Sequence, residues 1–173
     1  MHEVPTHPVP PVRRVRPGDG PLLRALRLEM LADTPIAFAE TLDSARTHPL
    51  RRWIAQAERN ASGDEKATYV AESGDRFVAA ATGLADGART WVVSVYVAPD
   101  HRGNGLVGQL IEEVGAWSAA AGRDQLVLEV AAENPRAVAA YARLGFTPTG
   151  ESSPHPLYPE VTEQVMVRPA SAS

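Results

Sequence analysis

The period of the apolar residues changes several times along the chain, and each change predicts a different secondary-structure element. Val12 to Arg16 predicts a short first strand, after which apolar residues recur at helical spacing from Leu22 to Leu31. A Pro-Gly-Asp turn at residues 17–19 separates the two elements. Asp19 is expected to cap the helix, because a side-chain oxygen at this place can accept a free backbone N–H.

An apolar loop that contains Ile36, Phe38 and Leu42 is expected to pack down on the protein after this first helix. Thr47, followed by Pro49, then predicts the start of a second helix. This helix is expected to direct Trp53, Ile54 and Ala57 inward.

From Lys66 onward the pattern changes to that of strands. Runs at residues 67–71 and 77–84 flank a Ser-Gly-Asp turn, and a second turn at residues 86–88 leads to a Val-rich run at 92–97. These three runs predict an antiparallel meander.

The second half of the chain alternates helices and strands. A helix is expected from Gly105 to about Ala121, followed by a strand from Leu126 to Val130, and a strand-helix-strand unit implies parallel neighbours. Asn134 and Pro135 predict a capped helix start, and strands near 146–149 and 161–167 complete the chain. The expected fold class is therefore α/β, with a mixed, mostly antiparallel central sheet flanked by helices.

Length and composition narrow the possible functions. The 173 residues suit one domain, expected at 12–169 between a Pro-rich disordered tail at 1–11 and a short disordered tail at 170–173. A net charge of −4 without a Lys/Arg run argues against nucleic acid, and no apolar run approaches a membrane span. The lack of cysteine excludes thiolate nucleophiles and favours a cytoplasmic location.

The stretch from Trp91 to Gly108 carries the clearest chemical signal. A buried-strand pattern ends at Pro99, and glycines at 103, 105 and 108 then lead into a helix. Glycines let backbone N–H groups approach a ligand, and the helix start adds its positive dipole end. The stretch therefore predicts a phosphate-binding site, to which Arg102 can add a positive charge.

Two familiar phosphate loops fit this stretch poorly. The Gly-Lys-Ser/Thr sequence of a Walker loop is absent. The dinucleotide pattern G-x-G-x-x-G is present, with Glu129 about twenty residues further on. However, five residues, Ala98 to Arg102, separate the strand from the first glycine, and only 44 residues follow Glu129. Both features argue against a dinucleotide-binding domain.

A second motif decides between these interpretations. The segment Arg102-Gly103-Asn104-Gly105 precedes a helix, and Leu126-x-Leu128-x-Val130, Asn134, Ala137, Tyr141 and Gly145-Phe146 follow at fixed spacing. Together these segments resemble the GCN5-related N-acetyltransferase (GNAT) superfamily, whose acyl-CoA N-acyltransferase fold has the same order of elements. Val107 departs from the family pattern, which usually has a small residue there.

The resemblance implies that the chain binds acetyl-CoA as its acyl donor. The loop backbone would hold the pyrophosphate, the end of the preceding strand would bind the pantetheine arm, and Asn134 would lie near that arm. The residues expected at the acetyl-CoA site are Val95, Tyr96, Val97, Arg102, Gly103, Asn104, Gly105, Leu106, Val107, Gly108 and Asn134. Metal ligands are not expected, because no His/Asp/Glu group has convincing spacing.

Tyr141 and Glu129 are the candidate catalytic residues. Tyr141 matches the general acid of the family, and its spacing of seven residues from Asn134 places both on one helix face. Glu129, twelve residues before Tyr141, matches the base of the family's ribosomal-protein acetyltransferases. A purely structural role stays open for all three residues: Tyr141 as a core aromatic, Asn134 as a helix cap, and Glu129 as a solvated strand residue. His101 and His155 are expected on surface loops.

The expected function is transfer of an acetyl group to a primary amine by direct attack in a ternary complex. A non-catalytic CoA-binding regulatory domain is the alternative. The acceptor site is expected among the first two helices, the loop around Phe38 and residues 152–161. The acidity of the chain suits a cationic amine but does not choose among a polyamine, an aminoglycoside, an amino acid and a peptide or protein N-terminus. The final strands leave a sheet edge, so a homodimer and a monomer both remain open.

Overall fold

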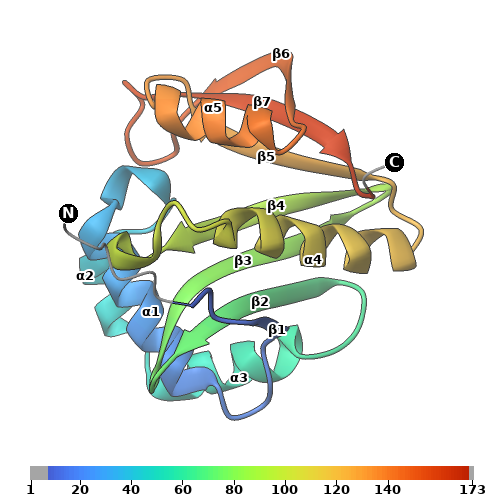
Figure 1. Ribbon diagram of the computed structural model, residues 1–173. Helices are drawn as coiled ribbons and strands as arrows, with labels where there is room; N and C mark the ends of the chain where they lie inside the picture. The colour runs from blue at the N-terminus through green and yellow to red at the C-terminus, as the bar shows by residue number, and fades with distance from the viewer. Residues whose placement is uncertain (1–7, 172–173) are drawn as a thin grey trace, which may run out of the picture.

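Strand pairing in the computed structural model, which describes residues 8–171, joins seven strands of that range into one sheet. The order across the sheet is β1-β2-β3-β4-β5-β7-β6 (Figure 1). The strands are β1 (Val12–Arg14), β2 (Lys66–Ser73), β3 (Arg76–Asp86), β4 (Arg89–Val97), β5 (Gln125–Ala131), β6 (Thr147–Pro154) and β7 (Thr162–Pro169). The α-helices are α1 (Gly20–Asp33), α2 (Leu42–Thr47), α3 (Leu50–Asn60), α4 (Leu106–Ala120) and α5 (Pro135–Arg143), and short 3-10 turns occupy η1 (Pro35–Ala37) and η2 (Pro99–His101).

Among the strand pairs of the described chain, only β4 and β5 run parallel. They are joined through α4, as the strand-helix-strand pattern predicts. The mixed, mostly antiparallel sheet with flanking helices is therefore confirmed, and so is the meander β2-β3-β4.

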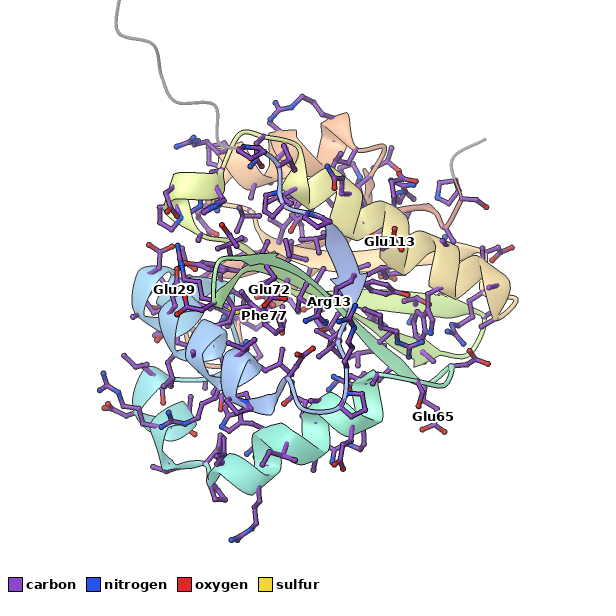
Figure 2. The ribbon with its side chains drawn as sticks, turned by 60° about the horizontal axis from the view of Figure 1, so that its bottom comes forward. Arg13, Glu29, Glu65, Glu72, Phe77 and Glu113 are labelled. Carbon is purple, nitrogen blue, oxygen red and sulfur yellow. The ribbon has the colours of Figure 1, made fainter. Side chains whose placement is uncertain are left out.

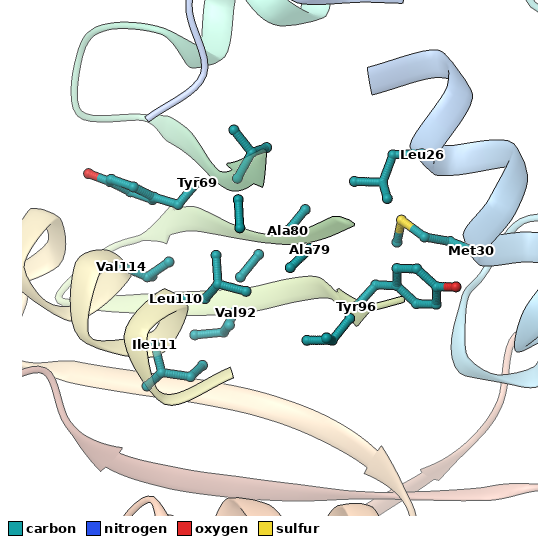
Figure 3. Packing of buried hydrophobic residues seen from close by; sticks show 14 of the residues in the cluster. Leu26, Met30, Tyr69, Ala79, Ala80, Val92, Tyr96, Leu110, Ile111 and Val114 are labelled. Atoms are coloured by element: carbon teal, nitrogen blue, oxygen red, sulfur yellow. The ribbon is translucent and has the colours of Figure 1, made fainter. Parts of the chain in front are cut away.

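The two faces of β3 explain how the helices are distributed. Consecutive residues of a strand point to opposite faces, and here a Cβ on Gly83 would lie 2.8 Å from the Trp117 ring of α4. The neighbouring Thr82 points to the opposite face, which α1 and α3 cover. Figure 3 shows Leu26, Met30 and Tyr96 gathered near α1, with Leu110 and Ile111 on the α4 side. Glycine at 83 lets α4 approach the sheet closely.

Asp19 does not cap α1, contrary to the sequence prediction. Its side chain makes no capping hydrogen bond and instead accepts from the guanidinium of Arg13 at 2.8 Å and from the backbone N–H of Arg16. Arg13 also donates to Glu72 on β2, and its guanidinium lies over the Phe77 ring. Figure 2 shows these three residues near one another. Asp19 therefore ties β1 to the following turn rather than stabilising the helix end.

The segment between α1 and α3 was predicted as a loop, and this was wrong in part. It contains α2, whose first turn is capped by the Thr41 hydroxyl accepting from the Ser44 N–H at 3.1 Å. The next helix begins at Leu50 rather than Thr47. Trp53 and Ala57 are buried as expected, but Ile54 is 38% exposed.

The predicted N-terminal tail lies largely outside the described residues, as do Ala172 and Ser173. Ala170, placed by the sequence analysis in the C-terminal tail, is buried, and its N–H donates to the Asp124 carbonyl at 2.8 Å. Across the described range, every helix falls short of the length and apolarity that a membrane crossing requires.

Candidate functional site

The neighbouring strands β4 and β5 separate soon after they begin. They pair only over Arg89–Trp91 and Gln125–Val127, and Figure 1 shows them converging at one end and diverging toward the start of α4. The register of β4 against β3 shifts over the same stretch, where Ser94 has a φ of 54°. Ser94 is the only non-glycine residue with positive φ in the described part of the chain. A bulge with such a residue bends a strand, and here it lies where β4 leaves β5.

The backbone of Val97 faces the opening between the two strands. Ala98 donates its N–H to the Val78 carbonyl of β3, and neighbouring residues of a strand direct their polar groups to opposite edges. The N–H and C=O of Val97 therefore point away from β3, toward the side that β5 has left. Val95 lies in the bulged stretch just before it, and Tyr96 turns its ring to the α1 face.

The loop after β4 shapes the start of α4 and leaves it open. Gly103 and Gly105 have φ angles of 79° and 85°, which disfavour any residue with a Cβ, and the space beside both is open. The Asn104 side chain accepts the N–H of Leu106 at 3.3 Å, and Gln109 bonds back to the Gly105 carbonyl. The N–H groups of the next two residues, 107 and 108, have no partner in the described chain. Two free donors at a helix start fit a phosphate.

Arg102 is already paired, so it does not offer a free charge. Its Nε donates to the Val97 carbonyl at 2.9 Å, its Nη2 lies 2.6 Å from the Asp33 carboxylate of α1, and the guanidinium covers the Tyr96 ring. The Tyr96 hydroxyl in turn donates to Asp33 and Glu29, and burial, helped by these two carboxylates, raises the pKa of Tyr96. Arg102 thus anchors the loop to β4 and α1.

Packing explains the residue types at positions 107 and 108. Val107 is half-buried and packs against the core, so its side chain need not crowd the loop. A Cβ on Gly108 would lie 3.3 Å from Leu144 at the end of α5, which links the two helices. A hollow of about 760 Å³ begins at Gly105 and Gly108 and runs between α4 and the turn after α5. A hollow of this size can take part of a large ligand.

Tyr141 lies on α5, one turn before Leu144. Its ring packs edge-on against Phe146 at 5.7 Å between centroids, and no described residue hydrogen-bonds its hydroxyl. Although the residue as a whole is partly exposed, burial of the hydroxyl raises the pKa of Tyr141 to about 12. The phenol therefore keeps its proton at neutral pH and can donate it. Asn134 caps the same helix, accepting the Ala137 N–H at 3.1 Å, as its capping interpretation predicts.

Glu129 belongs to a carboxyl pair that the sequence analysis did not find. On the paired strands β5 and β7, Glu129 and Glu163 project from one face, and burial together with a hydrogen bond to Glu129 raises the pKa of Glu163 to about 7. No motif signals this pair, because it depends on the register between strands 30 residues apart.

His155 borders the carboxyl pair and is 2% exposed, so its prediction as a surface residue was wrong. Its Nδ1 accepts the N–H groups of Leu157 and Tyr158, which places the ring proton on Nε2. This nitrogen lies 3.8 Å from Glu163 Oε1. The same correction applies to His101, which is 9% exposed.

Comparisons with known proteins identify the family of the chain. The family model of the Acetyltransferase (GNAT) family matches residues 28–146. A stretch covering 34% of this chain is 36% identical to the uncharacterized N-acetyltransferase YobR of Bacillus subtilis (strain 168), of whose length it spans 24%.

Two solved structures share the fold. An acetyltransferase of the GNAT family from Streptococcus pneumoniae superposes with a TM-score of 0.78 at 22% identity, over 92% of this chain and 98% of that chain. The structure of yncA, a putative acetyltransferase from Salmonella typhimurium with its cofactor acetyl-CoA, gives 0.73 at 19% identity over 95% of both chains. Because the family model matches well over half of the residues, the chain belongs to the GNAT acetyltransferase family.

Proposed function

We propose that this protein is an acetyl-CoA-dependent N-acetyltransferase that acetylates a primary amine by direct attack in a ternary complex. The observation that carries the proposal is the early separation of β4 from β5, which pair over three residues only. It leaves the Val97 N–H of β4 unpaired beside a helix start with two free N–H donors. A long ligand with a phosphate-bearing end and an amide-bearing arm fits this arrangement.

Each part of the opening would hold one part of the donor. The N–H groups of Val107 and Gly108 would bind the pyrophosphate, within the turn that Gly103 and Gly105 shape. The Val97 N–H would point to the thioester end, where it can stabilise negative charge on oxygen. Acetyl-CoA would supply an activated acetyl thioester at this place. Because the chain contains no cysteine, an acyl-enzyme on a thiol is excluded, and direct attack by the amine is the route that we propose.

Proton transfer would fall to Tyr141 and Glu129. The unpartnered Tyr141 hydroxyl would donate a proton to the departing thiolate, since a phenol with a pKa of about 12 carries its proton at neutral pH. An alkylammonium must lose a proton before it can attack. Glu129, exposed beside Glu163, would accept that proton directly or through one water.

The test is release of free thiol from acetyl-CoA in the presence of a panel of amines, with the product identified by mass. A Gly105→Ala variant should raise the KM for acetyl-CoA, because alanine disfavours the left-handed conformation that shapes the loop. Gly87→Ala is the matched control, since Gly87 has a φ of 59° in a hairpin turn with equally open space. CoA binding without turnover on any amine would instead indicate a regulatory domain.

A further inference from the structure

A second cavity lies on the α1 and α3 face of the sheet. Its volume is about 200 Å³, below the range of about 300–1,000 Å³ typical of drug-sized ligands, so it suits a small molecule. Residues of α1, α3, β2, β3 and β4 line it, among them Arg27, Arg52 and Lys66, with Glu40 as the single acidic residue. The titratable lining thus carries an excess of two positive charges, within a chain whose net charge is −4.

Glu40, the acidic residue of the cavity, already pairs with two neighbouring side chains. Glu40 pairs with Arg27 at 2.9 Å and with the His48 ring at 2.8 Å. Arg52 Nη1 lies 2.8 Å from a ring nitrogen of His48, which completes a chain from Arg52 to Arg27. One carboxylate therefore balances Arg27 and leaves the charge of Arg52 uncompensated.

Lys66 is the second uncompensated cation. No described residue forms an ion pair or a hydrogen bond with its ammonium, and the residue is half-buried at the start of β2. Burial, followed by the nearby charges of Arg59, Arg27 and Arg52, lowers the pKa of Lys66. A bound anion would remove this unfavourable crowding of like charges.

Neutral hydrogen-bonding groups complete the lining. Trp53 is 4% exposed, and its buried Nε1 has no hydrogen-bond partner. The hydroxyls of Thr68 and Thr82 lie 2.8 Å apart on the cavity wall. An indole N–H is a donor only, and this one, on a residue that lines the cavity, has no acceptor among the described residues.

The cavity reaches the bulge of β4. Val93 and Ser94 form part of its wall, and the Ser94 hydroxyl accepts from Arg27 Nη1 at 3.5 Å. Three residues further along β4, the Val97 backbone faces the opening proposed for the thioester. A small molecule held here by an anionic end can extend its other end toward that opening.

We propose that this cavity binds the anionic group of the acceptor through Lys66 and Arg52, with Trp53 as part of its wall. The acceptor is then a small amino-acid-like zwitterion whose carboxylate, or equivalent oxyanion, is held in the cavity while its amine meets the acetyl group. This inference rests on the proposed function for the identity of the reaction, but the anion site can be tested without turnover.

The first test compares L-amino acids with their carboxamides as acceptors. Free amino acids should have the lower KM, and Lys66→Gln or Arg52→Gln should raise that KM by about tenfold to a hundredfold while leaving kcat and the KM of the carboxamides nearly unchanged. Arg51→Gln is the matched control, because Arg51 is exposed on α3 and does not line the cavity. If spermidine is the preferred acceptor and Lys66→Gln leaves its KM unchanged, the anion site is refuted while the acetyltransferase function stands.

The second test needs no activity and no variant. Lys66 is the only lysine, so amine labelling with acetic anhydride modifies it and the N-terminus alone, and mass spectrometry reads each separately. N-acetylglycine and N-acetyl-L-leucine, which keep the carboxylate but lack a reactive amine, should slow labelling of Lys66 and not of the N-terminus. Their carboxamides should not. Protection without thiol release on any amine would support the site and reject the proposed reaction, whereas equal labelling with acids and amides would overturn the site.

Discussion

The Glu129–Glu163 pair makes the stability of the protein depend on pH in a direction opposite to that of an ordinary salt-bridged carboxylate. Burial and the neighbouring Glu129 raise the pKa of Glu163 from its ordinary 4.5 to about 7. Between these two values the unfolded chain has released the proton that the folded chain retains. Stability therefore falls as the pH rises from about 4.5 to about 7, and it changes no further from this source above that.

The size of the effect follows from the shift. At 1.36 kcal/mol per pKa unit, the free energy of unfolding can fall by at most ~3 kcal/mol over this pH range. Glu129 is exposed and Glu163 retains 15% of its side-chain surface, so water screens the pair and ~1–2 kcal/mol is the better expectation. Glu163→Gln keeps the shape and removes the titration. His155 Nε2 is the other polar group facing this carboxyl, and it can donate equally to the amide oxygen.

The assay is thermal unfolding of wild type and Glu163→Gln between pH 5 and pH 8.5. The Tm advantage of the variant should grow by about 2–8 °C over that range, at roughly 2–4 °C per kcal/mol for a domain of this size. Glu160→Gln, at an exposed position between β6 and β7, should keep a constant difference from wild type. Parallel Tm curves for wild type and Glu163→Gln would show that the two carboxyls do not share a proton, and the reasoning would fail.

Three further substitutions test other parts of the structure. Tyr141→Phe should lower kcat by roughly a hundredfold without loss of stability, because the hydroxyl has no partner to lose; full turnover would exclude Tyr141 as the acid. Glu129→Gln should remove the acidic limb of the pH–rate profile for kcat/KM, and an unchanged profile would place the base elsewhere. Gly115→Ala should destabilise the fold by ~1–3 kcal/mol in urea unfolding, because its Cβ would overlap the Ala170 carbonyl oxygen. Gly108→Ala is its control: the nearest atom is the movable Cδ2 of Leu144, and helix propensity favours alanine by up to ~1 kcal/mol, so a similar loss in both variants would contradict the packing argument.

The fold was predictable where local chemistry determines local structure. The Asn134-Pro135 start of α5 and the glycine turns of the meander need no distant residue, and all of them form as expected. Asp19 failed as a cap because Arg13 and the Arg16 N–H compete for its carboxylate. Such a competition depends on where β1 lies, which periodicity does not reveal.

In the candidate site, only the conformation of the backbone could be predicted from the sequence. The glycine pattern identifies the loop from Gly103 to Gly108, and the loop has the open helix start that this pattern implies. The role of Arg102 could not be predicted in the same way. Its partner Asp33 lies 69 residues earlier and neutralises the charge that we expected to bind phosphate. Glu163 was missed for a similar reason, since only the register of β5 against β7 brings it to Glu129.

Charge shows most clearly why composition cannot identify the acceptor. A net charge of −4 suggests a cationic substrate, but the Debye length is about 8 Å at physiological salt, so exposed acidic residues elsewhere on the surface contribute little inside a cavity. The charges that a bound molecule meets are those of the lining, where Arg52 and Lys66 are left uncompensated once Glu40 has paired with Arg27. These residues come from α3 and β2, and nothing in their sequence neighbourhoods indicates that they share a cavity. The sign of the local field, which selects an anionic group, therefore opposes the sign of the whole chain and depends on the tertiary structure.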